Sequence, residues 1–197
     1  SPGAILTRVA ASHIRVGTFE HFASRNDLPN LRVLVDYTIE RHFPEIRGAA
    51  NPEVLLLRGI IERQCALIPK WMGVGFIHGV MNTDNMTVSG ETIDYGPCAF
   101  MEAYDPAHIC NHTDQQGRYS YRMQPRIGEW NCFALGQAMV SLIGSVEDTQ
   151  EALAVYNPSF DAKLAALWRA KLGLQSIEPG DNELVKSLLD GLASNRV

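Results

Sequence analysis

The sequence predicts one mainly helical domain of the α+β class, with a small β-hairpin in its middle. Segments with apolar residues at helical spacing lie on both sides of a central stretch, residues 71–100. This stretch is rich in glycine, asparagine, aspartate and β-branched residues, which favours short strands and turns. The 197 residues, 46% of them hydrophobic, suffice for one sizeable core. Residues 1–197 are therefore expected to form a single unit.

A short strand and two helices are expected before the central stretch. Residues 5–10 have the composition of a strand, and a turn is expected near Gly17. Residues 31–42 place aliphatic side chains at helical spacing. The next helix has Asn51 as its N-cap and Pro52 in its first turn, and its apolar face continues to residue 68.

The central stretch predicts two short strands, and helices return after it. The strands are residues 86–88 and 92–93, joined by a tight turn. Residues 101–128 contain prolines, glycine and many polar residues, and we expect an irregular segment there. Four helices are expected after it: residues 130–143, 146–155, 159–172 and 181–192. The first is expected to place Trp130, Phe133 and Met139 in the core. Ser145 is a capping signal for the second, and Gly173 ends the third.

Composition and charge argue against several classes of function. The net charge of −5 provides no basic field for nucleic acid. No apolar run reaches the roughly 18–20 residues that span a bilayer, so no membrane role is expected. The four cysteines form no C-x-x-C pair, which favours reduced thiols over a structural zinc site. The chain starts at Ser1 without an initiating methionine, and we expect a processed chain or a fragment.

The densest cluster of polar residues runs from His78 to Asn85 and resumes at Asp94. Phosphoryl-transfer enzymes of the kinase type use a loop carboxylate to orient a nucleophile and a loop asparagine to bind metal. A second carboxylate, after a short strand pair, completes their metal site. Oxygen ligands of this kind suit Mg²⁺ or Mn²⁺. Asn85 and Asp94 are therefore the candidate ligands of the metal.

The match to the kinase pattern H-x-D-x-x-x-x-N is partial. His78 and Asn85 have the required spacing, and Asp94-Tyr95-Gly96 stands where a kinase has D-F-G. The position of the kinase catalytic aspartate is occupied by Val80, and Asp84 lies next to Asn85 instead. From these residues alone, a degenerate kinase site and a solvated polar turn both stay open.

The longer motifs resemble the selenoprotein O family of kinase-like proteins. The resemblance runs from residue 2 to about residue 145 and is carried by a set of strings: Thr7–Gly17, His78–Pro97, Ile109–Asp114, Gln124-Pro125 and Trp130-Asn131. It implies the larger, C-terminal lobe of a protein-kinase-like fold. It also implies that the ATP-binding lobe precedes residue 1 and that the family's C-terminal cysteine or selenocysteine region is absent from this sequence.

The resemblance further implies a function and a role for each site residue. Family members are described as protein adenylyltransferases, which move AMP from ATP to hydroxyl groups of proteins, with ATP flipped relative to kinases. By motif position, Asp84 corresponds to the catalytic base, and Asn85 and Asp94 correspond to the metal ligands. Arg8 and Arg15 correspond to residues that hold the phosphates of ATP. Ordinary kinase chemistry and a non-catalytic pseudokinase scaffold are the alternatives.

The remaining residues near the motif have simpler expected roles. His78 is expected to cap its loop by hydrogen bonding, and Tyr95 to pack against the preceding helix. Cys98 and Cys110 are expected to be buried thiols, although the family's redox control through cysteines makes a regulatory disulfide the alternative. We expect a cytoplasmic location in a bacterium and a mitochondrial one in a eukaryote.

Overall fold

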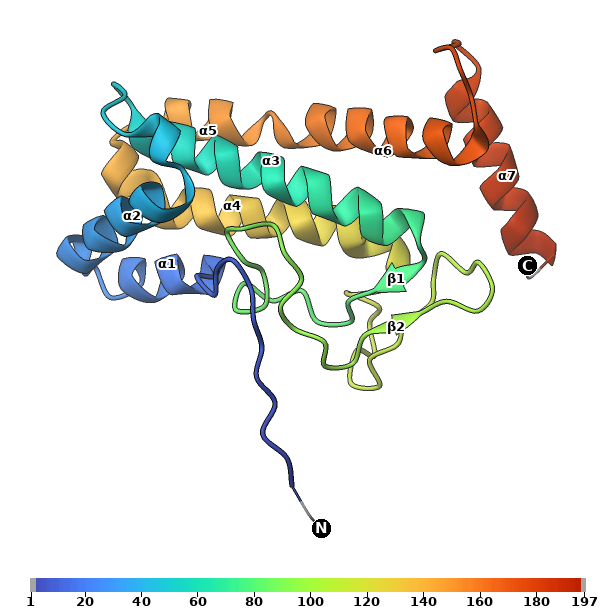
Figure 1. Cartoon of the computed structure of the whole chain (residues 1–197), viewed down its shortest axis with the longest axis horizontal. Helices are drawn as coiled ribbons and strands as arrows, with labels where there is room; N and C mark the ends of the chain where they lie inside the picture. The colour runs from blue at the N-terminus through green and yellow to red at the C-terminus, as the bar shows by residue number, and fades with distance from the viewer. Residues whose placement is uncertain (1–2, 196–197) are drawn as a thin grey trace.

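The computed structural model describes residues 3–195, which are mainly helical with one small antiparallel sheet (Figure 1). The fold class predicted from the sequence is confirmed. Two strands make up the sheet, with Phe76 paired to Phe100 and Ile77 to Ala99. The elements follow one another in this order: α1 (Val16–Ala23), α2 (Leu28–His42), η1 (Pro44–Ile46), α3 (Pro52–Gly73), β1 (Phe76–Ile77), β2 (Ala99–Phe100), η2 (Tyr121–Met123), α4 (Gln124–Ile143), α5 (Val146–Leu153), α6 (Tyr156–Leu172) and α7 (Asp181–Asn195).

Helix α3 is the centre of the fold. It packs against α4 on one side and against α5 and α6 on the other, while β1 adjoins its C-terminal end (Figure 1). Its buried side chains form one face of the core, which includes Leu57, Ile61 and Ile68. α1 and α2 lie at one end of this helical layer, and the sheet with its loops lies toward the other end (Figure 1). The loops that carry the polar motif are therefore supported by the C-terminal end of α3.

The helix ends show why most helices were predictable. The side chain of Ser145 accepts a hydrogen bond from the backbone N–H of Asp148 at 3.0 Å and caps α5, as predicted. Gly173 ends α6 in the left-handed conformation that glycine adopts without strain. Asn51 occupies the N-cap position of α3, as predicted. Its side chain makes no hydrogen bond to the helix, so the predicted side-chain cap was wrong.

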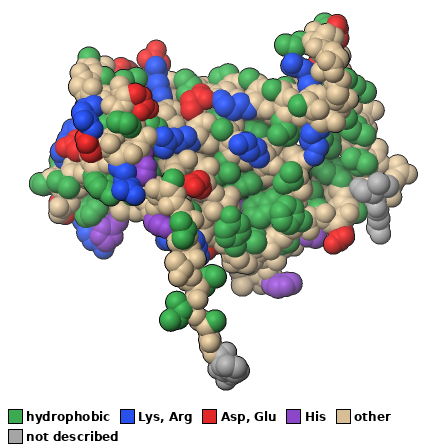
Figure 2. Space-filling view, viewed as in Figure 1, with side chains coloured by type: hydrophobic (Ala, Val, Ile, Leu, Met, Phe, Trp, Pro, Cys, Tyr) green, Lys and Arg blue, Asp and Glu red, His purple; other side chains and the backbone are tan. Residues whose placement is uncertain are grey.

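Three local predictions were wrong. Residues 5–10 form no strand but an extended arm whose Ile5, Leu6 and Val9 are exposed, and Figure 2 shows the arm standing out from the body. Gly17 lies inside α1 rather than in a turn. The hairpin expected at residues 86–93 is reduced to a single bridge between Met86 and Thr92. The two-stranded sheet is formed instead by residues 76–77 and 99–100.

Helix α4 begins at Gln124, inside the segment expected to be irregular, because Pro125 occupies its first turn, where no N–H is needed. Met139 is buried, as predicted. Trp130 and Phe133 are 44% and 58% exposed, so their predicted place in the core was wrong.

Among residues 3–195, none of the helices combines the length and the apolar character that crossing a bilayer requires.

Gly128 sets the distance between α3 and α4. A Cβ atom at this position would lie 2.1 Å from Cδ1 of Ile68 and 2.6 Å from the hydroxyl oxygen of Tyr156. We predict that Gly128→Ala lowers the free energy of unfolding by about 1–3 kcal/mol, because overpacking outweighs the gain in helix propensity. Urea unfolding measures this change.

Gly191 in α7 provides the matched control for this substitution. A Cβ atom there would meet nothing within 4 Å. Gly191→Ala should therefore leave the free energy of unfolding unchanged or raise it by up to about 1 kcal/mol. Equal effects of the two substitutions would contradict close packing of α3 on α4 at Gly128.

Candidate active site

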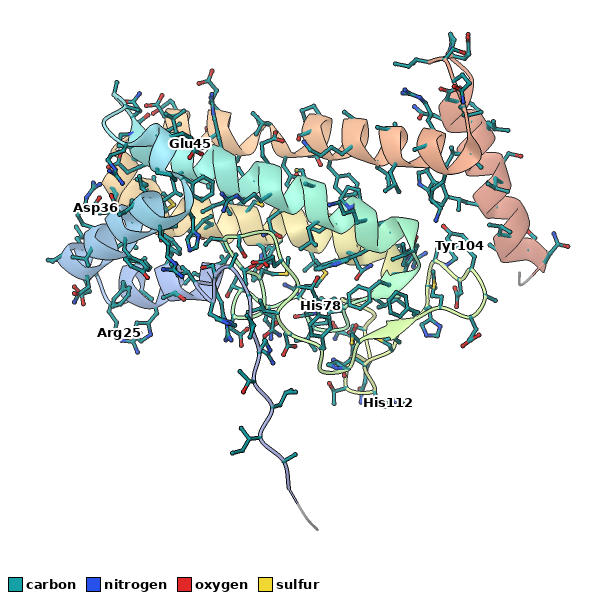
Figure 3. The ribbon with its side chains drawn as sticks, viewed as in Figure 1. Arg25, Asp36, Glu45, His78, Tyr104 and His112 are labelled. Atoms are coloured by element: carbon teal, nitrogen blue, oxygen red, sulfur yellow. The ribbon has the colours of Figure 1, made fainter. Side chains whose placement is uncertain are left out.

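The polar motif forms the loop region between β1 and β2, with His78 at its base (Figure 3). The imidazole of His78 is fully buried, and its ring centroid lies 5.3 Å from that of Trp71. Burial lowers the pKa of His78, against the opposing effect of the Asp94 carboxylate, so the ring is neutral at neutral pH. Its Nδ1 accepts the backbone N–H of Val80 at 3.4 Å. His78 thus caps its loop, as predicted.

Two buried polar side chains of α4 hold the same loop. Gln124 accepts the backbone N–H of His78 at 2.9 Å and donates to the carbonyl oxygen of Phe76 at 2.9 Å. Asn131 donates to the carbonyl oxygen of Met81, also at 2.9 Å. Buried backbone groups need such partners where no regular ladder provides them. The start of the loop is therefore fixed to a core helix.

A tight turn, residues 82–85, follows and carries the candidate base. The backbone N–H of Asn85 donates to the carbonyl oxygen of Asn82 at 2.9 Å and closes the turn. The side-chain amide nitrogen of Asn85 donates to the carbonyl oxygen of Val80 at 3.0 Å, which leaves its amide oxygen as the end that a ligand meets. Asp84 is exposed in this turn. The hydroxyl of Tyr119 donates to the Asn82 side chain and adds a further restraint.

The N-terminus of α1 holds the other side of this turn. The backbone N–H of Gly17 donates to the carbonyl oxygen of Thr83 at 2.8 Å, and that of Val16 donates to Met86 at 2.9 Å. A Cβ atom on Gly17 would lie 3.2 Å from the backbone nitrogen of Asp84, so the close approach favours glycine. The first amides of α1 are therefore used by the turn itself.

Arg15, the N-cap residue of α1, shares a hollow with Asp84. This hollow has a volume of about 600 Å³ and is open to solvent, and its lining comes from α1 and from the turn: Arg15, Gly17, Thr18, Glu20, His21, Phe22, Thr83 and Asp84. The Nε atom of Arg15 is buried and makes no hydrogen bond within residues 3–195. A cation and a carboxylate from distant parts of the sequence thus border one space.

Arg8 and Asp94 form a second pair. Nη2 of Arg8 lies 3.9 Å from Oδ1 of Asp94, and both side chains are partly exposed. Met86 and Thr92 form an antiparallel bridge. Asn85 directly precedes Met86 and Asp94 follows Thr92 by two residues, so both lie at the same end of this bridge. The structure thus places Arg8 against Asp94, Arg15 and Asp84 on one hollow, and Asn85 and Asp94 at one end of the same bridge.

The oxygen atoms of Asn85 and Asp94 suit a divalent cation that the protein and a nucleotide bind together. Asn85 presents an amide oxygen and Asp94 a half-buried carboxylate. Within residues 3–195, no group of three or more His, Cys, Asp or Glu side chains is placed to enclose an ion. Mg²⁺ commonly takes one or two protein carboxylate ligands and completes its shell with water and phosphate oxygens. The residues present fit this mode of binding.

Other residues near the site differ from their expected roles. Tyr95 is 59% exposed, so the packed position predicted for it was wrong. Cys98 and Cys110 are free thiols and only half-buried, and burial raises the pKa of Cys110.

Sequence reasoning missed the structural partners of the loop: Gln124, Asn131 and Tyr119. A polar residue on the apolar stripe of a helix is a signal for such a partner. Asn131 follows this rule, because it lies four residues after the buried Ile127 and is fully buried itself. Tyr119 lies in an irregular segment and gave no such signal.

Comparison with known proteins identifies relatives of this chain among bacterial nucleotidyltransferases. The chain is 54% identical to the protein nucleotidyltransferase YdiU of Rhizobium rhizogenes over 193 residues, covering 95% of the chain and 38% of that protein. It is 52% identical to the YdiU of Herminiimonas arsenicoxydans, covering 94% of the chain and 37% of that protein. For Bradyrhizobium diazoefficiens the identity is 50%, over 99% of the chain and 41% of the relative.

The chain therefore spans about two fifths of the length of the curated relatives it matches. The family model described as protein adenylyltransferase SelO matches residues 1–197, the whole sequence. This match covers the turn with Asp84 and Asn85, the arm with Arg8, and Asp94. The chain belongs to the SelO family of protein adenylyltransferases.

Proposed function

We propose that the full-length protein, of which this chain forms part, transfers AMP from ATP to serine, threonine or tyrosine hydroxyls of other proteins. The observation that carries the proposal is the hollow bordered by Arg15 and Asp84, which pairs a phosphate-binding cation with a carboxylate able to accept a proton. Residues 1–197 would form the larger lobe of a two-lobed, kinase-like enzyme. The three relatives are bacterial, so we expect the activity in the cytoplasm, where ATP is available.

Asn85 and Asp94 would hold Mg²⁺ or Mn²⁺ through their oxygen atoms. Such an ion neutralises phosphate charge and orients the phosphate chain when it is bound. Nη2 of Arg8 lies 3.9 Å from Oδ1 of the Asp94 carboxylate. This loose pair costs little to separate, since partly exposed ion pairs contribute about 0–1 kcal/mol. Asp94 is therefore available to a metal, and Arg8 to a phosphate.

Asp84 would accept the proton of the attacking hydroxyl group. Its carboxylate is exposed, while its backbone is held between α1 and the closing bond of the turn. A fixed backbone restricts where the carboxylate can point, and such positioning is what general base catalysis needs. Val80 has no group that can take a proton, which argues against the usual kinase base.

Arg15 would hold a phosphate group of ATP. The first two amides of α1 already bind the carbonyl groups of Thr83 and Met86, so anion binding at this helix end falls to the guanidinium group. Together, Arg8 and Arg15 would grip the outer phosphates, and pyrophosphate would leave as the hydroxyl attacks the α-phosphorus. A kinase would instead transfer the γ-phosphoryl group, and a pseudokinase scaffold would only bind nucleotide.

Asp94→Ala tests the metal site in the full-length protein. We predict near-complete loss of turnover at saturating ATP and Mg²⁺, because one of two protein oxygen ligands is removed. The melting temperature should stay unchanged, because the carboxylate contributes one weak ion pair. Asp36→Ala is the matched control, since Asp36 also pairs with an arginine at 3.7 Å but lies on α2. Full activity of Asp94→Ala would rule out its role as a ligand.

Asp84→Asn tests the base. The substitution keeps size and polarity but removes the proton-accepting charge, and we expect turnover to fall by about 10²- to 10⁴-fold. The affinity for ATP, measured by calorimetry, should be retained. Glu20→Gln is the control, because Glu20 lines the same hollow and should be dispensable. Weakened ATP binding at unchanged turnover would make Asp84 a binding residue instead.

ATP labelled separately at the α and γ positions tests the direction of transfer. We expect protein to take up the α label and not the γ label. Arg8→Ala and Arg15→Ala should each reduce labelling severely, because departing pyrophosphate loses a charge partner. Arg25→Ala, on the exposed C-terminal side of α1, should not. Uptake of the γ label alone would indicate a kinase, and uptake of neither would indicate a scaffold.

A further inference from the structure

An exposed surface of arginines and aromatic rings adjoins the turn that carries Asp84. The guanidinium carbon of Arg118 lies 4.8 Å from the ring centroid of Trp130 and 5.6 Å from that of Tyr119. Arg126 is exposed one helical turn before Trp130 on α4, and Arg122 is exposed four residues earlier. We call Arg118, Arg126 and Trp130, with Arg122 at their edge, the basic aromatic surface.

The arginines of this surface take part in no ion pair within the described part of the chain. None of its arginines forms an ion pair with a carboxylate of residues 3–195. Two carboxylates near this surface keep their negative charge but bind other groups. Asp114 accepts the backbone N–H groups of Arg118 and Tyr119 at 2.9 and 2.7 Å. Glu129 accepts a hydrogen bond from Asn157 at 2.7 Å. The three arginines outnumber these two carboxylates, so the balance of charge here is positive in a chain whose net charge is −5.

Stacking prepares Arg118 for an acidic ligand. Contact with an aromatic face uses the flat side of the guanidinium group and leaves the N–H groups at its edge free. Those N–H groups match the two oxygens of a carboxylate. An exposed Trp130 adds apolar area beside the charge, a combination that is enriched at the centres of protein interfaces.

The surface is connected to the proposed catalytic turn through two neighbouring residues. Tyr119, next to Arg118, donates to Asn82 within the turn. Asn131, next to Trp130, donates to the carbonyl oxygen of Met81 immediately before the turn. A polypeptide bound along the surface would therefore run beside the turn that holds Asp84.

We propose that the basic aromatic surface binds an acidic segment of the protein substrate while the acceptor hydroxyl lies at Asp84. This inference rests on the proposed function, because it takes the bound acidic segment to belong to the substrate of AMP transfer. It adds a substrate class: proteins whose modified serine, threonine or tyrosine is flanked by aspartate or glutamate. Phosphate groups of ATP are bound elsewhere, by Arg8 and Arg15 in the proposed function.

Two fluorescent peptides of equal length test this proposal on the full-length protein. Each carries one serine, flanked by glutamates in one peptide and by lysines in the other. Fluorescence anisotropy, which needs no turnover, should show at least about tenfold tighter binding of the glutamate peptide, weakened by added salt. The double variant Arg118→Glu/Arg126→Glu should lose about tenfold in affinity for that peptide, with ATP affinity unchanged.

Arg41→Glu is the matched control, because Arg41 is exposed on α2 at the opposite end of the helical layer (Figure 1). It should bind the glutamate peptide as the unchanged protein does. Equal binding of the two peptides, or equal behaviour of the double variant and the control, would overturn the proposal. Uptake of the α label by protein without preference for acidic flanks would overturn it while leaving AMP transfer intact. Tight binding of the glutamate peptide that depends on Arg118 and Arg126, without label uptake, would support acidic binding at this surface and reject AMP transfer.

Discussion

The anchoring of an irregular loop to the buried side of α4 is the interaction on which the rest of the site depends. Gln124 satisfies two backbone groups and Asn131 a third, all inside the core. A buried backbone group left without a partner costs about 1–3 kcal/mol, so these bonds strongly restrict alternative paths of the loop. The position of α4 against α3, set by Gly128, therefore fixes where the turn with Asp84 and Asn85 begins.

The same turn is held from its other side by α1, and this explains how distant parts of the sequence meet. The amides of Val16 and Gly17 bind carbonyl groups on both sides of Asp84 and Asn85. An N-terminal helix end is usually an anion site, but here the loop uses its amides, and Arg15 supplies the positive charge. Anchors from α1 and α4 therefore leave the outer face of the turn free for chemistry.

Helical periodicity and capping residues made the helices predictable, because both signals are local in sequence. Ser145 and Gly173 act through bonds or dihedral angles within a few residues of themselves. The strand expected at residues 5–10 failed because a strand needs a partner, and β-propensity contains no information about one. The kinase-like motif located Asp84 and Asp94, whereas Arg8 and Arg15 were identified from the resemblance alone. Trp130 was misplaced because its apolar character does not reveal the stacked Arg118.

Val80 offers a last argument about how this site differs from that of a kinase. Its carbonyl oxygen accepts the side-chain amide of Asn85, and any residue could provide that bond. Its side chain is only half-buried, so packing does not demand an apolar group there. The absence of a carboxylate at position 80 is therefore not imposed by the fold. The carboxylate lies instead at Asp84, which borders the same hollow as Arg15, and this is the arrangement that the proposed AMP transfer requires.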